Sequence, residues 1–352
     1  MKKKLFALMI CALAIFASCQ KDPEPTGNNN DNNTTMAAYV LSEGNWGGNN
    51  ATLGLLTDKT LDNNWFTTNN NRGLGELAQD AIHYGSRLYV TVSGSEKVEV
   101  IDTKTGKSIK QIDFGQKYPR YMVAHEGKVY VTSYDKTVVR IDTAALEIEA
   151  TCQLTGLQPE QLCLIGNNLY ICNTWENGSD GNAIYDNTIS VVDLASFTEV
   201  RKIQVGTNPG KIKTLDDHRF IVACSGNYGD EEALCMVVDV NNDSKTTLAV
   251  AASNFDVCDN TVYMYATTYA ANWTTITSFY TMDINTLHPE QILQDYSDEL
   301  SSAYAICVNP TTKQIFVSNS VYGATSDIYV FSPAGEKLRQ EEGGLYTNKI
   351  IF

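Results

Sequence analysis

The hydrophobic pattern of the chain repeats seven times, at intervals of roughly 40 to 50 residues. Each copy holds a short apolar strand, a loop rich in aromatic and amide residues, and a second apolar strand that often ends in Asp. The copies begin at Tyr39, Leu88, Val129, Leu169, Phe220, Val262 and Ile315. Several strand-like runs within each repeat are typical of a propeller blade. The pattern therefore predicts an all-β, seven-bladed propeller built of four-stranded antiparallel blades.

The repeat that starts near Arg120 shows how one blade is arranged. The apolar run 121–124 suits burial near the ring axis, and further strands are expected at 129–132, 138–142 and 147–154. Along this antiparallel path, the loops between the second and third strands lie on the same face as the connections into the inner strands. The two faces of the ring therefore carry different kinds of loop.

The C-terminal run 347–352 is similar to the inner-strand run 208–213. We expect it to supply the inner strand of a blade whose other three strands come from residues 37–68. This closure joins the two ends of the chain and leaves no open sheet edge. Residues 37–352 are therefore predicted to form one domain.

The N-terminal residues predict export. Lys2, Lys3 and Lys4 precede an apolar run, residues 5–17, that is too short to span a bilayer, so residues 1–18 are expected to be a signal peptide. The small residues before Cys19 resemble the lipobox of bacterial lipoproteins, which makes Cys19 the expected lipidated residue. Residues 20–24 resemble the acidic tag that sends Bacteroidetes lipoproteins to the cell exterior, and residues 19–36 are a predicted polar tether. We expect an outer-membrane protein held by its lipid anchor alone.

The net charge limits the classes of binding partner, and the cysteine count limits the possible disulfides. With 26 Lys and Arg against 41 Asp and Glu, the formal net charge is −15, so nucleic acid and anionic lipid are poor partners. The alternative reading is that the charge only keeps a surface protein soluble.

Besides Cys11 and Cys19 the chain has seven cysteines, an odd number, so at least one is expected to be free. The pairs Cys163–Cys172 and Cys224–Cys235 are candidate disulfides, and the alternative is a buried apolar role for each thiol.

Loops on one predicted face combine Trp or Tyr with Asn, Ser, Thr and Gly. Hairpin turns need no large aromatic side chain, so we expect an aromatic rim suited to a large ligand with apolar surface and many amide or hydroxyl groups. The alternative is that each aromatic folds back onto its own blade. The predicted ligand-binding residues are Asn45, Trp46, Tyr118, Arg120, Tyr134, Trp175, Asn208, Tyr228, Tyr269, Trp273, Tyr304 and Tyr322, and the expected floor near the axis adds Lys211, Phe255 and Asn348.

The sequence offers no catalytic constellation. It has no GxSxG, P-loop, HxxxH or paired-Cys metal motif. The four histidines are expected at turns on the face opposite the aromatic loops: His83, His125, His218 and His288. We therefore predict no catalytic residue, metal or cofactor. One alternative is a Ca²⁺ site in the loop 174–187, which carries Glu176, Asp180 and Asp186.

The chain from Ala37 to Phe352 resembles the YncE-like seven-bladed propellers through strings such as 88–91, 100–106 and 191–194. The lipobox, the tether and the run 39–46 (YVLSEGNW) resemble more specifically the BtuG-like surface cobalamin-binding lipoproteins of Bacteroidetes. This resemblance implies capture of cobalamin or related corrinoids and their transfer to a TonB-dependent outer-membrane transporter. It also implies that cobalamin is cargo rather than a cofactor.

The same residues also fit two other function classes. One is a glycan-binding or adhesive surface propeller, because aromatic platforms with Asn and Asp also suit sugars. The other is a metal-dependent propeller hydrolase or lactonase, which would need an acidic ring on the inner strands. The sequence offers only the scattered acids Asp80, Glu160 and Asp256 for that ring.

Overall fold

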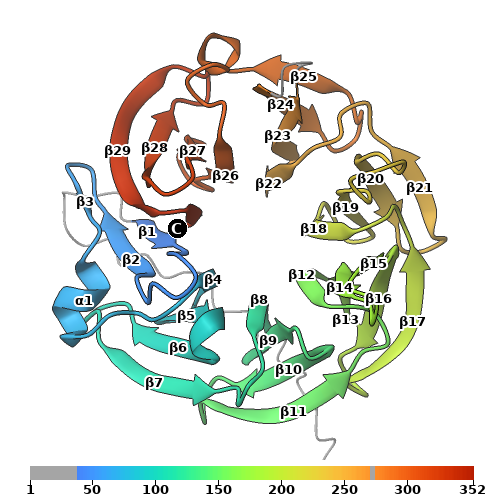
Figure 1. Cartoon of the computed structure of the whole chain (residues 1–352), viewed down its shortest axis with the longest axis horizontal. Helices are drawn as coiled ribbons and strands as arrows, with labels where there is room; N and C mark the ends of the chain where they lie inside the picture. Colours follow the sequence, from blue (N-terminus) through green and yellow to red (C-terminus); the bar gives the residue numbers. More distant parts are fainter. Residues whose placement is uncertain (1–37, 270–273) are drawn as a thin grey trace, which may run out of the picture.

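The chain forms a closed ring of seven four-stranded antiparallel blades (Figure 1). The computed structural model describes residues 38–269 and 274–352. Within these two ranges no helix has the length and apolar character needed to cross a bilayer. The predicted all-β, seven-bladed architecture is confirmed. The signal peptide, Cys19 and the tether lie outside the described residues.

Each blade runs from an inner strand at the axis to an outer strand at the circumference. The inner strands are β30 (Thr347–Ile351), β4 (Ala78–Tyr84), β8 (Pro119–His125), β12 (Pro159–Ile165), β18 (Pro209–Thr214), β22 (Asn254–Cys258) and β26 (Ala303–Val308). The second strands are β1 (Ala38–Ser42), β5 (Arg87–Val92), β9 (Lys128–Ser133), β13 (Asn168–Asn173), β19 (Arg219–Cys224), β23 (Thr261–Tyr269) and β27 (Ile315–Asn319).

The two outward layers follow the same order. The third strands are β2 (Thr52–Leu56), β6 (Lys97–Asp102), β10 (Thr137–Asp142), β16 (Thr188–Asp193), β20 (Leu234–Asp239), β24 (Thr275–Asp283) and β28 (Thr325–Phe331). The outer strands are β3 (Leu61–Asp62), β7 (Ser108–Asp113), β11 (Glu147–Gln153), β17 (Thr198–Gln204), β21 (Ser244–Thr247), β25 (Pro289–Ile292) and β29 (Lys337–Leu345). A separate hairpin pairs β14 (Trp175–Asn177) with β15 (Ala183–Tyr185), and two short 3₁₀ turns cover Ser93–Ser95 and Gln294–Tyr296.

The two ends of the described chain meet in one blade. Strand β30 pairs antiparallel with β1, with Val40 opposite Ile350. In Figure 1 the red C-terminal strand lies beside the blue β1. Ile350 and Ile351 are buried and pack into the neighbouring cores. This arrangement agrees with the closure that the sequence predicts.

The first blade differs from the prediction at its outer edge. Residues 37–68 were expected to supply three strands, but β3 has only two residues and a helix, α1 (Trp65–Asn70), follows it. Phe66 is buried, and the Trp65 ring centroid lies 5.1 Å from that of Tyr39. A helical turn lets both adjacent aromatics pack inward, whereas a strand would send them to opposite faces.

The hydrophobic core lies between blades, because each sheet buries both of its faces. One cluster joins Tyr170 and Cys172 of the fourth blade to Phe220 and Val222 of the fifth. Alternate residues of a strand serve different clusters, as expected from the two-residue period of a strand. Each blade is therefore stabilised mainly by its two neighbours.

All seven cysteines of the described chain are free and buried, so neither candidate disulfide forms. Cys224 pairs with Leu234 rather than Cys235, and the two thiols face different cores. Cys163 lies opposite Tyr170, so Cys172 is only its diagonal neighbour. Diagonal positions lie about 7–8 Å apart, beyond the Cα spacing of about 4.4–6.8 Å that a disulfide needs. The alternative of buried apolar thiols is the correct one.

Buried hydroxyls on second strands join adjacent blades at bulges of the inner strands. Each hydroxyl accepts the N–H of its own inner strand and donates to an inner-strand carbonyl of the next blade. The three cases are Thr91 (Asp80 N, 2.9 Å; Arg120 O, 2.6 Å), Thr132 (Tyr121 N, 3.0 Å; Glu160 O, 2.9 Å) and Ser318 (Ala305 N, 3.0 Å; Thr347 O, 2.6 Å). These links satisfy backbone groups that the irregular register leaves without a ladder partner.

Candidate functional site

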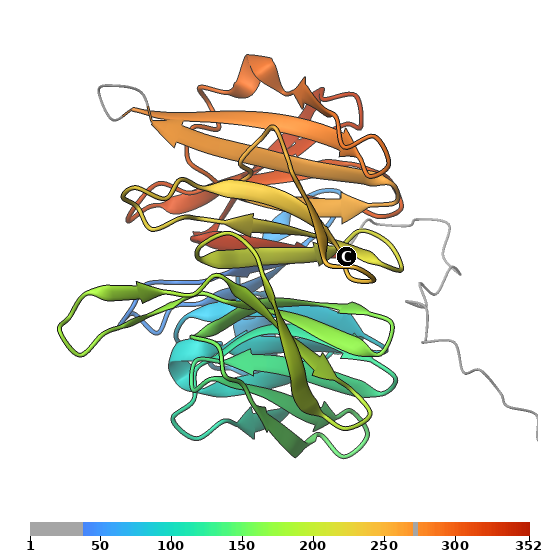
Figure 2. The same cartoon turned by 90° about the vertical axis from the view of Figure 1, so that its right-hand side faces the viewer.

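One face of the ring carries every exposed aromatic side chain of the described residues. These seven side chains, which we call the aromatic rim, belong to loops between second and third strands or to entries into inner strands: Trp46, Tyr118, Trp175, Tyr228, Tyr269, Tyr304 and Tyr322. Figure 2 shows the β14–β15 hairpin (yellow-green) and the β23–β24 hairpin (orange) extending beyond the same side of the ring. The exposed aromatic surface is thus confined to the face that the loop pattern indicates.

Several rim residues lie far out in solvent. Tyr322 is 94% exposed, Tyr228 81% and Trp46 74%. Tyr228 also has a φ of 57°, a left-handed conformation that bulky residues rarely adopt. An aromatic residue at that position is therefore explained neither by burial of its side chain nor by a backbone conformation that favours it. Such features are typical of residues that serve a contact outside the domain.

Other predicted binding residues have structural partners. Asn208 is buried with a φ of 58°, and its backbone bonds to Asp186 and Ser225. Asn45 is half-buried beside Trp46, and its N–H bonds to Asn50. Trp273 lies outside the described residues.

A cavity of about 1030 Å³ occupies the centre of the ring. Five residues of the expected floor line it: Arg120, Lys211, Phe255, Tyr304 and Asn348. Tyr118 and Asn208 are not among the lining residues. The wall mixes charged, amide and phenolic side chains with apolar ones. It also includes residues that the sequence analysis did not select: Glu43, Gln79, Tyr121, Gln161, Tyr265 and Lys349.

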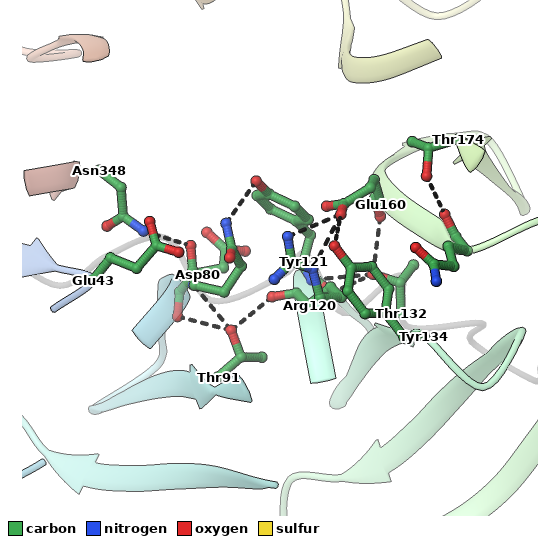
Figure 3. Close-up of polar contacts among 12 residues, drawn as sticks. Glu43, Asp80, Thr91, Arg120, Tyr121, Thr132, Tyr134, Glu160, Thr174 and Asn348 are labelled. Atoms are coloured by element: carbon green, nitrogen blue, oxygen red, sulfur yellow. Dashed lines mark hydrogen bonds and ion pairs between the residues drawn. The ribbon is translucent and has the colours of Figure 1, made fainter. Parts of the chain in front are cut away.

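Arg120 lines the cavity and takes part in an ion pair that carries a stacked aromatic ring (Figure 3). Arg120 donates from Nη2 to Glu160 Oε1 at 2.9 Å, and the guanidinium lies 4.4 Å from the centroid of the Tyr134 ring. Tyr134 also donates its hydroxyl to Glu160. Burial by itself lowers the pKa of Arg120, but the Glu160 carboxylate outweighs it and the pKa is raised. Tyr134 thus folds back onto the ring instead of joining the rim.

Tyr304 links the rim to the cavity. Its hydroxyl donates to Glu43 Oε2 at 2.8 Å, and burial together with this carboxylate raises the pKa of Tyr304. Tyr346 packs between Tyr304 and Tyr322, with ring centroids 6.1 and 6.4 Å away. The Tyr346 hydroxyl accepts the N–H of Gly323 at 2.8 Å, which anchors the loop that carries Tyr322. An aromatic surface therefore runs from the rim into the cavity.

The inner-strand carboxylates do not form an open acidic ring. Asp80 pairs with Lys349, Glu160 with Arg120, and Asp256 with Lys213. Asp80 and Asp256 also accept the N–H of Met122 and Val308 on the next inner strand, at 2.8 and 2.9 Å. These acids therefore satisfy backbone donors at the edges of neighbouring blades, where no further strand can pair with them.

The carboxylates of the loop 174–187 are engaged separately. Glu176 pairs with Lys136 at 2.7 Å, and Asp180 accepts two bonds from Asn182 within its own turn. Asp186 accepts the N–H of Leu157 and the hydroxyl of Thr188. Within the described ranges, the group of acidic and His side chains close enough to share a metal is Asp216, Asp217 and His218. It lies at the turn between β18 and β19, on the face opposite the rim.

Two of the four histidines occupy turns as predicted, whereas the other two lie at the ends of inner strands. His125 ends β8, and His218 and His288 lie between strands on the opposite face. His83 lies near the end of β4 and lines the cavity at that end, with its ring 6.5 Å from that of Tyr39. The cavity therefore passes through the ring from the aromatic face towards the histidine face.

The residues that sequence reasoning missed lie next to those that it selected. Tyr121 follows Arg120, and Lys349 follows Asn348. Both line the cavity because bulges at the start of β8 and β30 rotate successive side chains toward the axis. The proline before Arg120 indicates where the inner strand β8 begins, but no residue pattern in the sequence indicates the bulge. Glu43 directly precedes the loop that carries Asn45 and Trp46, and a single acidic residue there gives no binding signal of its own.

Comparisons with known proteins support the fold. No protein-family model matches the chain. A search of curated proteins gives no match either. Similar solved structures include a chain of Kuenenia stuttgartiensis hydrazine synthase, with a TM-score of 0.61 and 12% identity over 74% of this chain and 84% of that one.

Two further structures show the same likeness. The computationally designed protein Ika8 has a TM-score of 0.56 and 12% identity, over 88% of this chain and 89% of that one. A chain of the mitotic checkpoint complex has a TM-score of 0.53 and 12% identity, over 72% and 75%. Such diverse proteins share an architecture and no common activity. By fold, the chain is a seven-bladed β-propeller.

Proposed function

We propose that the chain is a non-catalytic surface lipoprotein that binds cobalamin or a related corrinoid and passes it to a TonB-dependent outer-membrane transporter. The observation that carries the proposal is the confinement of all seven exposed aromatics of the described chain to one face, which also holds one mouth of the cavity. The resemblance of residues 39–46 and of the N-terminal segment to BtuG-like proteins supplies the ligand class.

The physical fit rests on size and polarity. Ligand pockets usually measure about 300–1,000 Å³, so a cavity of about 1030 Å³ suits a large molecule. A corrin has broad apolar faces and a fringe of neutral amides. Tyr and Trp rings can cover the faces, while Asn and Gln side chains such as Gln79, Gln161 and Asn348 can bond to the fringe.

The binding experiment uses the ring domain, residues 37–352, because the ring closes on itself within the described residues. The domain is mixed with cyanocobalamin and desalted, and corrin absorbance is measured in the protein fraction. We expect stoichiometric retention. Colourless protein after stoichiometric loading would sink the proposal.

The role of the rim is tested by matched substitutions. Trp46→Ala combined with Tyr228→Ala removes two exposed aromatics of the rim. Ile109→Ala combined with Val200→Ala removes two exposed aliphatic side chains from the outer strands β7 and β17. Hot-spot residues, among which Trp and Tyr are enriched, cost about 2 kcal/mol or more when truncated. We therefore expect at least about 10-fold weaker corrinoid binding for the first pair. The second pair should bind normally. Equal affinities for both pairs would move the site elsewhere.

Anchoring and transfer need separate measurements. Cys19→Ala should abolish incorporation of labelled fatty acid and release the protein from the membrane fraction. Crosslinking on intact cells should join the wild-type protein to a TonB-dependent transporter. The crosslink should form even when the growth medium contains no corrinoid. A protein that stays membrane-bound after Cys19→Ala would contradict the anchor.

The glycan-binding alternative shares the aromatic rim. It is distinguished by ligand: a shift in rim Trp fluorescence with polysaccharide but not with corrinoid would favour it. The metal-dependent hydrolase has less support, because Asp80, Glu160 and Asp256 are each neutralised by a cation. Metal-dependent turnover of an ester or lactone would favour that class instead.

A further inference from the structure

Among the described residues, one cation of the cavity wall has no carboxylate partner. Inner strands contribute four cationic side chains: Arg120, Lys211, Lys213 and Lys349. Three of them form ion pairs, with Glu160, Asp256 and Asp80. In the part of the chain that the structure describes, no carboxylate lies within ion-pair distance of Lys211. In a protein of net charge −15, such an unpaired cation inside a ring needs an explanation.

Lys211 is held in place by groups from two other blades. Its Nζ lies 3.4 Å from the Tyr121 hydroxyl oxygen and 5.5 Å from the centroid of the Tyr121 ring. Gln79 Nε2 donates to the same hydroxyl oxygen at 2.9 Å. In Figure 3, Tyr121 lies between Asp80 and the Arg120–Glu160 pair. Gln79, Tyr121 and Lys211 therefore form a polar bridge along one wall of the cavity.

This bridge has more donors than acceptors. The Tyr121 oxygen accepts two hydrogen bonds, so its own proton is left to donate to a further group. A lysine ammonium has three donors, and the Tyr121 contact uses one of them. Surplus N–H and O–H groups converging on one point of a cavity are suited to an anionic acceptor.

Lys211 keeps its charge in this setting. The low-dielectric surroundings inside the ring lower its pKa, but interactions with Tyr121, Tyr265 and Glu160 outweigh that effect and the pKa is raised. The cation is therefore fully protonated at neutral pH. A half-buried positive charge inside the ring attracts a negative charge more strongly than a fully exposed one does.

We propose that Lys211, Tyr121 and Gln79 form a subsite for a singly charged phosphodiester on the bound molecule. This inference rests on the proposed function, since cobalamin carries one phosphodiester, in its nucleotide arm, and is otherwise rich in neutral amides. Cobinamide has the same corrin ring and lacks the arm. The subsite therefore orients the nucleotide arm toward the wall formed by β4, β8 and β18.

The test compares the two corrinoids on matched variants. Lys211→Met removes the charge, Lys211→Arg keeps it, and Lys245→Met removes an exposed lysine from the outer strand of the same blade. A charge-assisted hydrogen bond contributes about 1.5–3 kcal/mol, so Lys211→Met should weaken cyanocobalamin binding by about 10- to 100-fold. Cobinamide binding should change less than about 2-fold. Lys245→Met should change neither affinity.

The outcomes separate the subsite from the function. If Lys211→Met leaves cobalamin binding unchanged, or weakens both corrinoids equally, the phosphodiester subsite is overturned while corrinoid binding stands. If the wild-type protein binds neither corrinoid, the proposed function fails. In that case the subsite is tested by titrating the protein with dimethyl phosphate while the NMR signals of its ¹³C-dimethylated lysines are recorded. A shift of the signal that Lys211→Met removes supports the subsite, and no shift overturns it.

Discussion

The hydroxyl of Thr132 offers a direct test of how the blades are joined. Thr132 is fully buried, and its Oγ1 accepts the Tyr121 N–H at 3.0 Å and donates to the Glu160 carbonyl at 2.9 Å. Thr132→Val replaces the hydroxyl with a methyl group of similar size, so no cavity forms. The substitution leaves a donor and an acceptor without partners at the two bulges.

The expected cost follows from those two groups. Each buried polar group without a partner costs about 1–3 kcal/mol, and the carbonyl is the more tolerant of the two. We therefore expect Thr132→Val to lower the free energy of unfolding by about 2–4 kcal/mol. Thr132→Ser keeps the hydroxyl and loses one buried methyl, which costs about 1 kcal/mol. Thr246→Val, on the exposed outer strand β21, should stay within about 0.5 kcal/mol of wild type.

Equilibrium urea unfolding, followed by tryptophan fluorescence, measures these differences through the transition midpoints when the slopes agree. Because the two bulges also position Arg120 and Glu160, Thr132→Val should additionally weaken ligand binding, and Thr246→Val should not. The reasoning is refuted if Thr132→Val is no less stable than Thr132→Ser. In that case the hydroxyl link would contribute little beyond its packing.

Three further predictions follow from the structure. The bond from Lys128, aided by the N–H groups of Ala145 and Ala144, lowers the pKa of Asp142 from 3.8 to about 2. The stability that the Asp142 carboxylate contributes is therefore present above about pH 4 and lost as the pH falls toward 2. In Asp142→Asn the urea midpoint should depend less on pH within that window, and the same pH dependence as in the wild type would contradict this. Burial raises the pKa of Cys163 and Cys224 to about 12. Ellman's reagent at pH 8 should therefore modify none of the seven buried thiols in the native ring and all of them in urea. Rapid reaction of the native ring would show that the thiols are accessible. A chain that ends at Tyr346 lacks β30 and exposes the inner edge of the first blade, so it should lose cooperative unfolding by circular dichroism, and a wild-type transition would show that closure is dispensable.

The repeat made most of the architecture readable from the sequence. Period-two apolar runs and turn residues recur in each copy, so the strand order and the closure by residues 347–352 could be inferred before any coordinates. The exposed aromatic face was also inferable, because loop position in an antiparallel blade decides the face. The helix at Trp65–Asn70 was not, since a short Asn-rich segment carries little helical signal and tertiary packing of Phe66 decides its form.

The sequence by itself determined the repeating blade, the acidic surface and the placement of aromatics on one face, because these depend on local periodicity and on chain order. Only the tertiary structure decided which side chains meet around the axis. Bulges at the entries of β8 and β18 help to bring Tyr121 and Lys211 together from positions 90 residues apart. The closed ring places Asp80, Glu160 and Asp256 beside cations from other blades. Those contacts depend on register and ring closure, which no local pattern encodes. The aromatic rim was therefore predictable, whereas the charge arrangement within the cavity was not.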